Sequence, residues 1–239
     1  MYDASDVIPV NRGESERSST HPLSQAYMRH RVSEVFCRQG VREAVIPAYM
    51  GLIKQIDDQL GVLFEFLRQR GLFDNTMIVF TSDHGDYLGD HWLGDKDHMH
   101  DAAVKVPLLI YDPSPEADRT RGQVCDAMVE AIDVLPTFIE WLGGTVPTHR
   151  VEGLSLLPWL HEGRTEHWRR YAISEYDYSM MQASETLGVA PRDARMFMVA
   201  NQRWKYIAVL GMRPMLFDRE SDPGELSDLG DHPDLEDVR

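Results

Sequence analysis

The longest regular pattern of apolar residues lies between residues 42 and 70. Its members recur at steps of three and four: Ile46, Met50, Ile53, Leu60, Phe64 and Leu67, with Asp57 as the polar exception. This spacing places them on one face of an α-helix, so we predict a helix over 42–70. Pro47 fits the first turn of that helix, where no backbone donor is lost. Gly71 is the residue expected to end it.

Two short apolar runs after this helix predict buried strands. Residues 76–81 are rich in β-branched side chains and follow a turn at Asp74-Asn75, and residues 106–111 form a second run of the same kind. Asp133 can cap a helix that continues to Leu142. The succession of helix, strand, loop, strand and helix is typical of an α/β sheet.

The pattern changes after Gly153. Four segments have the length and composition of short antiparallel strands: 171–176, 195–200, 204–210 and 214–217. A hairpin turn is predicted at residues 201–203, although it lacks the usual glycine. We therefore divide the chain into an α/β part over 1–150 and a small α+β subdomain over 151–239. Residues 1–20 are polar and rich in turn formers, and we expect them to be an irregular surface segment.

Charge narrows the range of partners. The chain has 39 acidic and 24 basic residues, a net charge of −15. That balance argues against nucleic acid and against an anionic membrane surface, since both need a basic face. Small anionic substrates remain open, because a bound metal can reverse the field inside a cleft.

Neither the cysteines nor the hydropathy of the sequence predicts disulfide bonds or a membrane-spanning helix. Cys37 and Cys125 do not make a disulfide framework, and no apolar stretch reaches the roughly 18 residues that a membrane span needs. The first residues lack the basic start and apolar centre of a signal peptide. A cytoplasmic location is the expectation that follows.

The densest polar cluster occupies residues 82–101, between the two predicted strands. It holds six Asp, four His and one Lys. Asp83 and His84 come directly after the first strand, and in a sheet of parallel strands ligands bind beyond the carboxyl ends. Carboxylate oxygen and imidazole nitrogen together suit a divalent metal, and Gly85 permits the turn that both would need. The residues alone leave an alternative open, in which Asp83 caps a turn and His84 is a surface residue.

Two ligands are too few for a catalytic ion. Other residues of the cluster could add ligands, although a solvated or structural role is favoured for each: His91, His98, His100, Asp86, Asp90 and Asp95. Lys96 is the cluster's only base, and it either balances charge or holds an anionic group of a substrate. The sequence contains no G-x-S-x-G, P-loop or G-x-G-x-x-G motif. A hydrolase built on this chain would use a metal-bound water, or a nucleophile that the chain does not contain.

Residues 81–91, Thr-Ser-Asp-His-Gly-Asp-Tyr-Leu-Gly-Asp-His, resemble the sulfatase family of the alkaline phosphatase superfamily. The Asp-His-Gly form, with Lys96 thirteen residues after Asp83, most resembles the branch of phosphonate monoester hydrolases and phosphodiesterases. Five further segments resemble family segments and occur in the family's order: 49–57, 105–110, 132–137, 152–158 and 216–226. Each alone is weakly specific, but the ordered set covers nearly the whole chain.

The resemblance implies a fold and a set of roles. The fold would be a partial alkaline-phosphatase-like α/β sandwich followed by a small C-terminal antiparallel sheet with a helix. Asp83 and His84 would bind one divalent ion (Mn, Ca, Mg or Zn), and Lys96 would contact oxygens of the transferred group. The substrate would be a small anionic ester: a phosphonate monoester, a phosphodiester or a sulfate ester. His84 favours phosphoryl substrates, because the arylsulfatase branch usually carries Asn there.

Three departures from the family pattern qualify this reading. The family nucleophile is a formylglycine made within a Cys/Ser-x-Pro-x-Arg motif, and this sequence has no such motif. The family's first metal-binding aspartates and its His-Pro-Pro-Phe segment are also missing. Residues 1–9 resemble the stretch shortly after that segment. We therefore expect the C-terminal half of a longer hydrolase, inactive alone, with the formylglycine in the missing half.

Two further points stay open from the sequence. The alternative function is a non-catalytic, truncated domain that binds a partner or assembles, and a homo-oligomer fits because relatives often form dimers or tetramers. A second group of residues could line a substrate pocket or belong to the core: Tyr176, Tyr178, Met180 and Met181.

Overall fold

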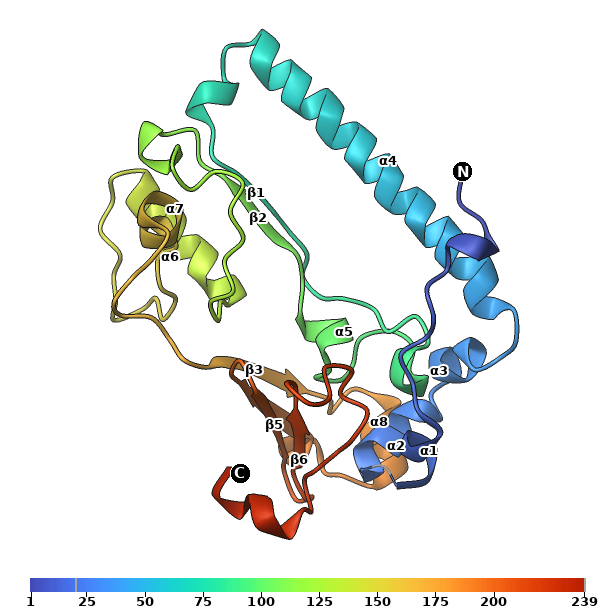
Figure 1. The fold of residues 1–239 in the computed structure, drawn as a ribbon. Helices are drawn as coiled ribbons and strands as arrows, with labels where there is room; N and C mark the ends of the chain where they lie inside the picture. The colour runs from blue at the N-terminus through green and yellow to red at the C-terminus, as the bar shows by residue number, and fades with distance from the viewer. Residues whose placement is uncertain (20, 239) are drawn as a thin grey trace. The chain divides into compact units, whose positions relative to one another are not determined.

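The computed structural model of the protein describes residues 1–19 and 21–238. The chain forms two compact units, and each combines segments that are far apart in sequence (Figure 1). The first contains Met1–Gly61, Ser82–Pro107 and Ile173–Arg239, and the second contains Val62–Thr81 and Leu108–Ala172. The division into 1–150 and 151–239 stays a prediction. Among the described residues, no helix is both long and apolar enough to cross a lipid bilayer.

The N-terminal segment of the first unit is helical rather than irregular. A 3₁₀ turn, η1 (Ala4–Asp6), precedes three short helices: α1 (Glu14–Ser19), α2 (Pro22–Met28) and α3 (Arg31–Phe36). The prediction of an irregular surface segment over residues 1–20 is therefore wrong for α1. The physical reason is Glu16, a charged residue that is buried because its carboxylate contacts His91 at 2.8 Å.

The predicted long helix is confirmed as α4 (Val41–Gln69). The helix begins at Val41, more than one turn before Pro47, and the Ala44 N–H already donates to the Gly40 carbonyl. Pro47 thus lies inside the helix, and its placement in the first turn was wrong. The helix ends at Gln69, and Gly71, two residues later, has a φ of +66°. Of the predicted apolar positions, Ile46 is buried, Ile53 is exposed and the other four are half-buried.

The second unit contains both predicted strands, β1 (Ile78–Thr81) and β2 (Leu108–Tyr111). They pair antiparallel, with Ile78 opposite Tyr111 and Thr81 opposite Leu108. The argument from the carboxyl ends of parallel strands was therefore wrong for this pair. The strands are also not buried within the described chain, where Phe80 is 38% and Leu109 59% exposed.

Two short helices complete this unit: α6 (Val134–Trp141) and α7 (Leu157–Glu162). Asp133 stands at the N-cap of α6 but makes no side-chain cap bond. Its carboxylate instead accepts the Leu154 N–H at 2.8 Å and pairs with the Arg169 guanidinium. Asp133 thus ties α6 to the segment that leads into α7, and the predicted capping role was wrong.

The predicted C-terminal strands are confirmed as a four-stranded sheet in the order β3-β4-β5-β6. Its strands are β3 (Ala172–Asp177), β4 (Arg195–Ala200), β5 (Trp204–Val209) and β6 (Met215–Asp218). β5 pairs antiparallel with both neighbours. The hairpin between β4 and β5 needs no glycine, because the Asn201 carboxamide accepts the N–H groups of Arg203 at 2.9 Å and Trp204 at 2.6 Å. A short helix, α8 (Gln182–Leu187), lies between β3 and β4.

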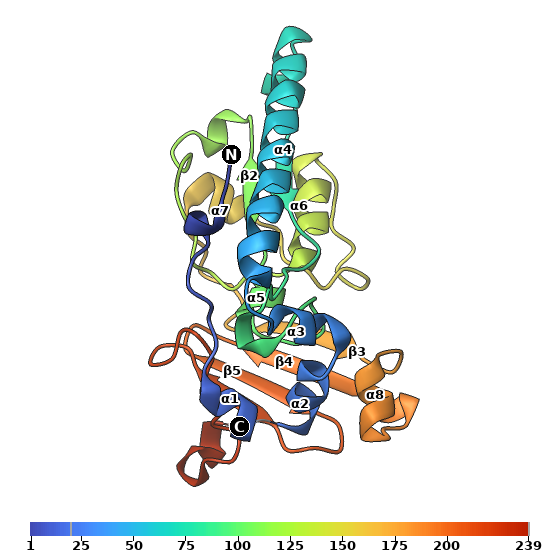
Figure 2. The same ribbon diagram turned by 90° about the vertical axis from the view of Figure 1, so that its right-hand side faces the viewer.

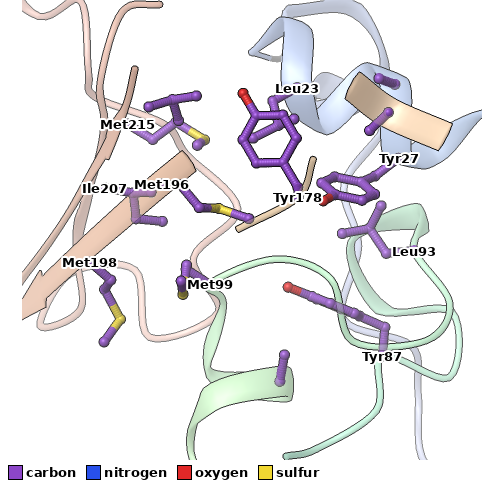
Figure 3. Close-up of a cluster of buried hydrophobic side chains, with 14 of the residues drawn as sticks. Leu23, Tyr27, Tyr87, Leu93, Met99, Tyr178, Met196, Met198, Ile207 and Met215 are labelled. Carbon is purple, nitrogen blue, oxygen red and sulfur yellow. The ribbon is translucent and has the colours of Figure 1, made fainter. Parts of the chain in front are cut away.

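One face of this sheet carries the main core of the first unit (Figures 2 and 3). Alternate residues of β4 and β5 are buried, as the two-residue period of a strand requires. They pack against α2 and against apolar side chains of the polar segment: Tyr87, Leu93 and Met99. Burying each side chain of this size stabilises the fold by about 1.5–3 kcal/mol. The sheet therefore anchors the segment in which the predicted site lies.

Candidate metal and anion site

The segment from Ser82 to His100 has a strained backbone. Among the described residues, five other than glycine adopt a positive φ, and four of them lie here: Leu88, His91, Trp92 and Asp95. Each such residue costs about 1–2 kcal/mol relative to a right-handed conformation. The conformation persists because the N-terminal segment binds it.

The shortest hydrogen bonds between residues 11–13 and this segment come from backbone groups and the Trp92 indole. The His91 N–H donates to the Asn11 carbonyl at 2.8 Å, the Asn11 N–H donates to the Asp90 carboxylate at 2.9 Å, and the Trp92 indole donates to the Gly13 carbonyl at 2.8 Å. The guanidinium of Arg12 lies 4.1 Å from the centre of the Trp92 ring. Residues 11–13 therefore hold the strained turn in place.

The predicted ligand pair is exposed and close together. The Asp83 side chain is 84% exposed and the His84 side chain 41%, and Asp83 Oδ2 lies 3.5 Å from His84 Nε2. His84 Nδ1 lies 2.7 Å from the Gly85 carbonyl, which can only accept, so Nδ1 carries the proton. In the neutral ring, Nε2 then has a free lone pair beside the carboxylate. The backbone N–H of His84 donates to Asp83 and lowers the pKa of that carboxyl.

Gly85 is required by space rather than by an unusual φ. Its N–H donates to the Ala103 carbonyl at 2.8 Å, and a Cβ at this position would lie 1.9 Å from the Ala102 carbonyl oxygen. Both alanines belong to α5 (Asp101–Val104). The turn that carries Asp83 and His84 is therefore pressed directly against α5.

Lys96 is the third predicted site residue. Its side chain is 44% exposed and lies 3.6 Å from the Asp95 carboxylate. The Tyr176 hydroxyl donates to the neighbouring Asp97 at 2.7 Å, which ties this part of the loop to β3. The Lys96 side chain is therefore exposed, next to a residue whose side chain is bonded to the sheet.

Asp86 connects Lys96 with the ligand pair. Burial raises the pKa of this carboxyl, and the nearby Asp95 raises it further, whereas His84 and Lys96 both lower it. The pKa of Asp86 thus responds to two of the predicted site residues, His84 and Lys96. The structure brings Asp83 and His84 into contact and places Lys96 within electrostatic reach of the same cluster.

The remaining histidines of the segment are buried in a stack. Ring centroids of His91 and His100 are 4.0 Å apart, and those of His98 and His100 are 4.6 Å apart. Their ring nitrogens contact Glu16, Ser24 and Tyr87 at 2.8–3.0 Å. Burial lowers the pKa of His98 to about 3 and that of His100 well below its ordinary value. These rings are packed structural groups, and the described residues contain no cluster of three or more His, Cys, Asp or Glu arranged to hold a metal.

The four residues for which the sequence allowed either a pocket or a core position differ in their burial. Tyr178 is fully buried in the core, Met181 packs against it, and Met180 is 91% exposed. Tyr176 has the bond to Asp97 described above. Sequence reasoning missed this bond and a buried ion group around Asp101. The only available signal was the 216–226 segment, which contains two of that group's members.

Comparison with known proteins identifies the family. The family model described as Sulfatase matches residues 12–144, and the model described as N-sulphoglucosamine sulphohydrolase, C-terminal, matches residues 89–239. The multifunctional alkaline phosphatase superfamily protein PehA of Trinickia caryophylli is 34% identical over 98% of this chain and 48% of its own length. An arylsulfatase of Clostridium perfringens is 34% identical over 76% of this chain and 35% of its own length.

Solved structures agree with this assignment. The phosphonate monoester hydrolase of Agrobacterium radiobacter is similar over 99% of this chain and 49% of its own, with 29% identity and a TM-score of 0.88. The phosphonate monoester hydrolase SpPMH of Silicibacter pomeroyi matches all of this chain and 49% of its own, with a TM-score of 0.86. The chain spans about half the length of the curated relatives it matches. With a family model over more than half of its residues and the fold of these hydrolases, the chain belongs to the sulfatase family of the alkaline phosphatase superfamily.

Proposed function

We propose that this chain supplies Asp83, His84 and Lys96 to the active site of a metal-dependent hydrolase. Its substrates would be small anionic esters, namely phosphonate monoesters, phosphodiesters or sulfate esters. The observation that carries the proposal is the His84 ring, which donates from Nδ1 to the Gly85 carbonyl and has Nε2 beside the Asp83 carboxylate. The names of the relatives include hydrolases of phosphonate and of sulfate esters, which supports this substrate class.

The pair has the chemistry of two metal ligands. Bonds from zinc to imidazole nitrogen or carboxylate oxygen are about 2 Å long, so donors 3.5 Å apart suit one ion. Metal-binding histidines usually donate their other N–H to a carbonyl or carboxylate, as His84 does. The lowered pKa of Asp83 keeps it ionised, the form that binds a cation. A catalytic ion usually has three protein ligands, so these two residues fit it as part of a site.

Lys96 would contact the substrate. A bound divalent ion supplies a positive charge that polarises the ester. The exposed ammonium group of Lys96 would add a second positive charge, on a loop that the bond between the Asp97 and Tyr176 side chains ties to β3. Fixed charges of this kind stabilise negative charge that develops on the oxygens of the transferred group.

Metal binding tests the proposal without depending on turnover. Calorimetric titration of the 239-residue chain with Zn²⁺ and with Mn²⁺ should detect a site that Asp83→Ala and His84→Ala each weaken by at least about tenfold. The exposed residues Asp74 and His149 provide matched controls, because Asp74→Ala and His149→Ala remove the same groups elsewhere. Unchanged metal affinity in both site variants would refute the proposed ligand roles.

A non-catalytic role in binding or assembly is the second candidate. It is supported by apolar side chains on the surface of α4, where Leu52, Ile53 and Ile56 are each more than half exposed. Exposed apolar patches of this kind mark interaction surfaces. A domain of this class would self-associate or bind a partner through α4 whether or not Asp83 and His84 bind metal.

A further inference from the structure

Four charged groups meet at the start of α5. Lys205 Nζ lies 2.6 Å from Asp101 Oδ1 and 2.5 Å from Glu225 Oε1, and Arg219 Nη2 lies 2.7 Å from Asp101 Oδ2. Lys205 is 1% exposed and Glu225 is 2% exposed. Two positive and two negative charges balance one another, which is the condition under which buried charges persist. We call these four residues the α5 clamp.

The clamp lowers the pKa of Asp101. Burial alone would raise the pKa of Asp101, but Lys205 and Arg219 outweigh it and hold that pKa below its ordinary value. The Asp101 N–H also donates to Glu225 Oε2 at 2.7 Å. Glu225 therefore binds both the backbone and, through Lys205, the side chain of the residue that begins α5.

Glu225 adopts a backbone conformation that favours glycine. Its φ is +54°, and it is the one non-glycine residue with positive φ outside the 88–95 turn among the described residues. Strain of this kind persists when surrounding contacts over-determine the conformation. The contacts of its carboxylate with the Asp101 N–H and with Lys205 are of this kind. They explain why a glutamate occupies a position whose backbone conformation favours glycine.

α5 in turn contacts the ligand turn. Gly85 donates to the Ala103 carbonyl at 2.8 Å and has no room for a side chain against Ala102. His84 Nδ1 donates to the carbonyl of the same Gly85. A continuous series of contacts thus runs from Lys205 and Glu225, through Asp101 and α5, to the ring of His84.

We infer that Lys205, Arg219 and Glu225 are positioning residues, which set the place of the Asp83–His84 turn by fixing α5. The inference rests on the proposed function, because it gives that turn a role in metal binding. Ligands of a metal need support from the residues behind them, and a directional ion group orients a short helix in a way that apolar packing does not. The clamp supplies this support from β5 and from the segment after β6, which contain none of the predicted ligands.

Hydrogen exchange and metal binding test the clamp in the full 239-residue chain. The variants are Lys205→Met, Glu225→Ala and Glu225→Gln. Lys54→Met is the matched control, since Lys54 pairs with Asp58 on the exposed side of α4. In Lys205→Met and Glu225→Ala, we expect the Gly85 and Lys105 amides to exchange at least tenfold faster, and Zn²⁺ affinity to fall at least threefold. Amides of β4 and β5 should be unaffected.

Glu225→Gln separates positioning from a general loss of structure. Its carboxamide oxygen can still accept the Asp101 N–H, so Gly85 exchange should lie between the wild-type and Glu225→Ala values. This near-isosteric variant also decides the question if Lys205→Met does not fold. Gly85 exchange and Zn²⁺ affinity within twofold of wild type in every folded clamp variant would overturn the inference.

The two proposals can fail separately. In one outcome, Gly85 exchanges faster in the clamp variants, but Zn²⁺ binding does not depend on Asp83 and His84. This result would support the effect of the clamp on the turn and refute the ligand roles. Zn²⁺ binding that depends on Asp83 and His84 but is unchanged in the clamp variants would retain the ligands and reject the positioning role.

Discussion

His91 and His100 stack face to face, with ring centroids 4.0 Å apart and 10° between the ring planes. His98 stacks on the other side of His100 at 4.6 Å. Burial in this stack lowers the pKa of His98 and of His100, so the neutral form of these two rings is favoured. The stack therefore connects the fold of the polar segment to pH.

The first prediction concerns acid stability. In the folded chain, burial lowers the pKa of His98 to about 3 and that of His100 well below the unfolded value near 6.5. Below pH 6.5 the unfolded chain binds protons that the folded chain does not, so stability falls as pH falls. The loss should reach up to about 1.4 kcal/mol per pH unit for each histidine. Urea denaturation between pH 7.5 and 4 measures it.

A variant isolates the contribution of the stack. His98→Gln keeps a polar group near Ser24 and removes one titrating ring, so the slope of stability against pH should become shallower. The matched control is His149→Gln, at an exposed position, which should leave the slope unchanged. Equal slopes in wild type and His98→Gln would contradict the assignment of this pH dependence to the stack.

The second prediction concerns Gly85. In Gly85→Ala the new Cβ would meet the Ala102 carbonyl, so either the turn or α5 must shift. We expect a loss of about 1–3 kcal/mol in the free energy of unfolding, together with weaker Zn²⁺ binding. Gly51→Ala is the control, because a Cβ there meets nothing and alanine favours α4 by up to about 1 kcal/mol. Chemical denaturation should move the two midpoints in opposite directions.

The third prediction concerns catalysis by this chain alone. The sequence has no Cys/Ser-x-Pro-x-Arg motif, and the described residues provide no cluster of three metal ligands. Hydrolysis of an aryl phosphonate monoester and of an aryl sulfate by the purified 239 residues should not exceed the rate in buffer with Mn²⁺ or Zn²⁺. Sustained turnover that His84→Ala abolishes would show that the chain is sufficient, and would overturn this expectation.

The fourth prediction concerns the exposed apolar side chains of Leu52 and Ile56 on α4. Leu52→Ser combined with Ile56→Ser removes two large apolar groups that are 59% and 52% exposed. Sedimentation velocity should then show less self-association at equal concentration, while helix content by circular dichroism changes little. Gln55→Ser combined with Gln59→Ser changes exposed polar positions of the same helix and should leave association unaltered. A higher oligomer fraction in the Leu52/Ile56 variant would contradict the assembly role.

The secondary structure was predictable where one periodicity dominates. α4 and β4 agree with their predicted ranges to within a residue, because apolar spacing is enough to define a long helix or an alternating strand. Pairing was not predictable, and β1 and β2 were expected in a parallel sheet although they pair antiparallel. Two short apolar runs contain no information on their relative direction.

The candidate site divides in the same way. Asp83, His84 and Lys96 lie within fourteen consecutive residues, so a local motif was enough to propose them. The clamp joins positions 104 and 124 residues apart, and the charges of Lys205 and Glu225 resemble those of any surface residue until their burial is known. The histidine stack was similarly hidden, because three histidines in a polar loop give no indication that they are packed inside.

The left-handed backbone of Glu225 has a consequence for variation near the end of the chain. A one-residue deletion between β6 and Glu225 would move this carboxylate away from Asp101 and remove one of the two carboxylates that pair with the buried Lys205. Length in that segment is therefore constrained by residues in the first half of the sequence. Under the proposed ligand roles, we expect that a change more than a hundred positions away from Asp83 and His84 would weaken metal binding with both residues intact.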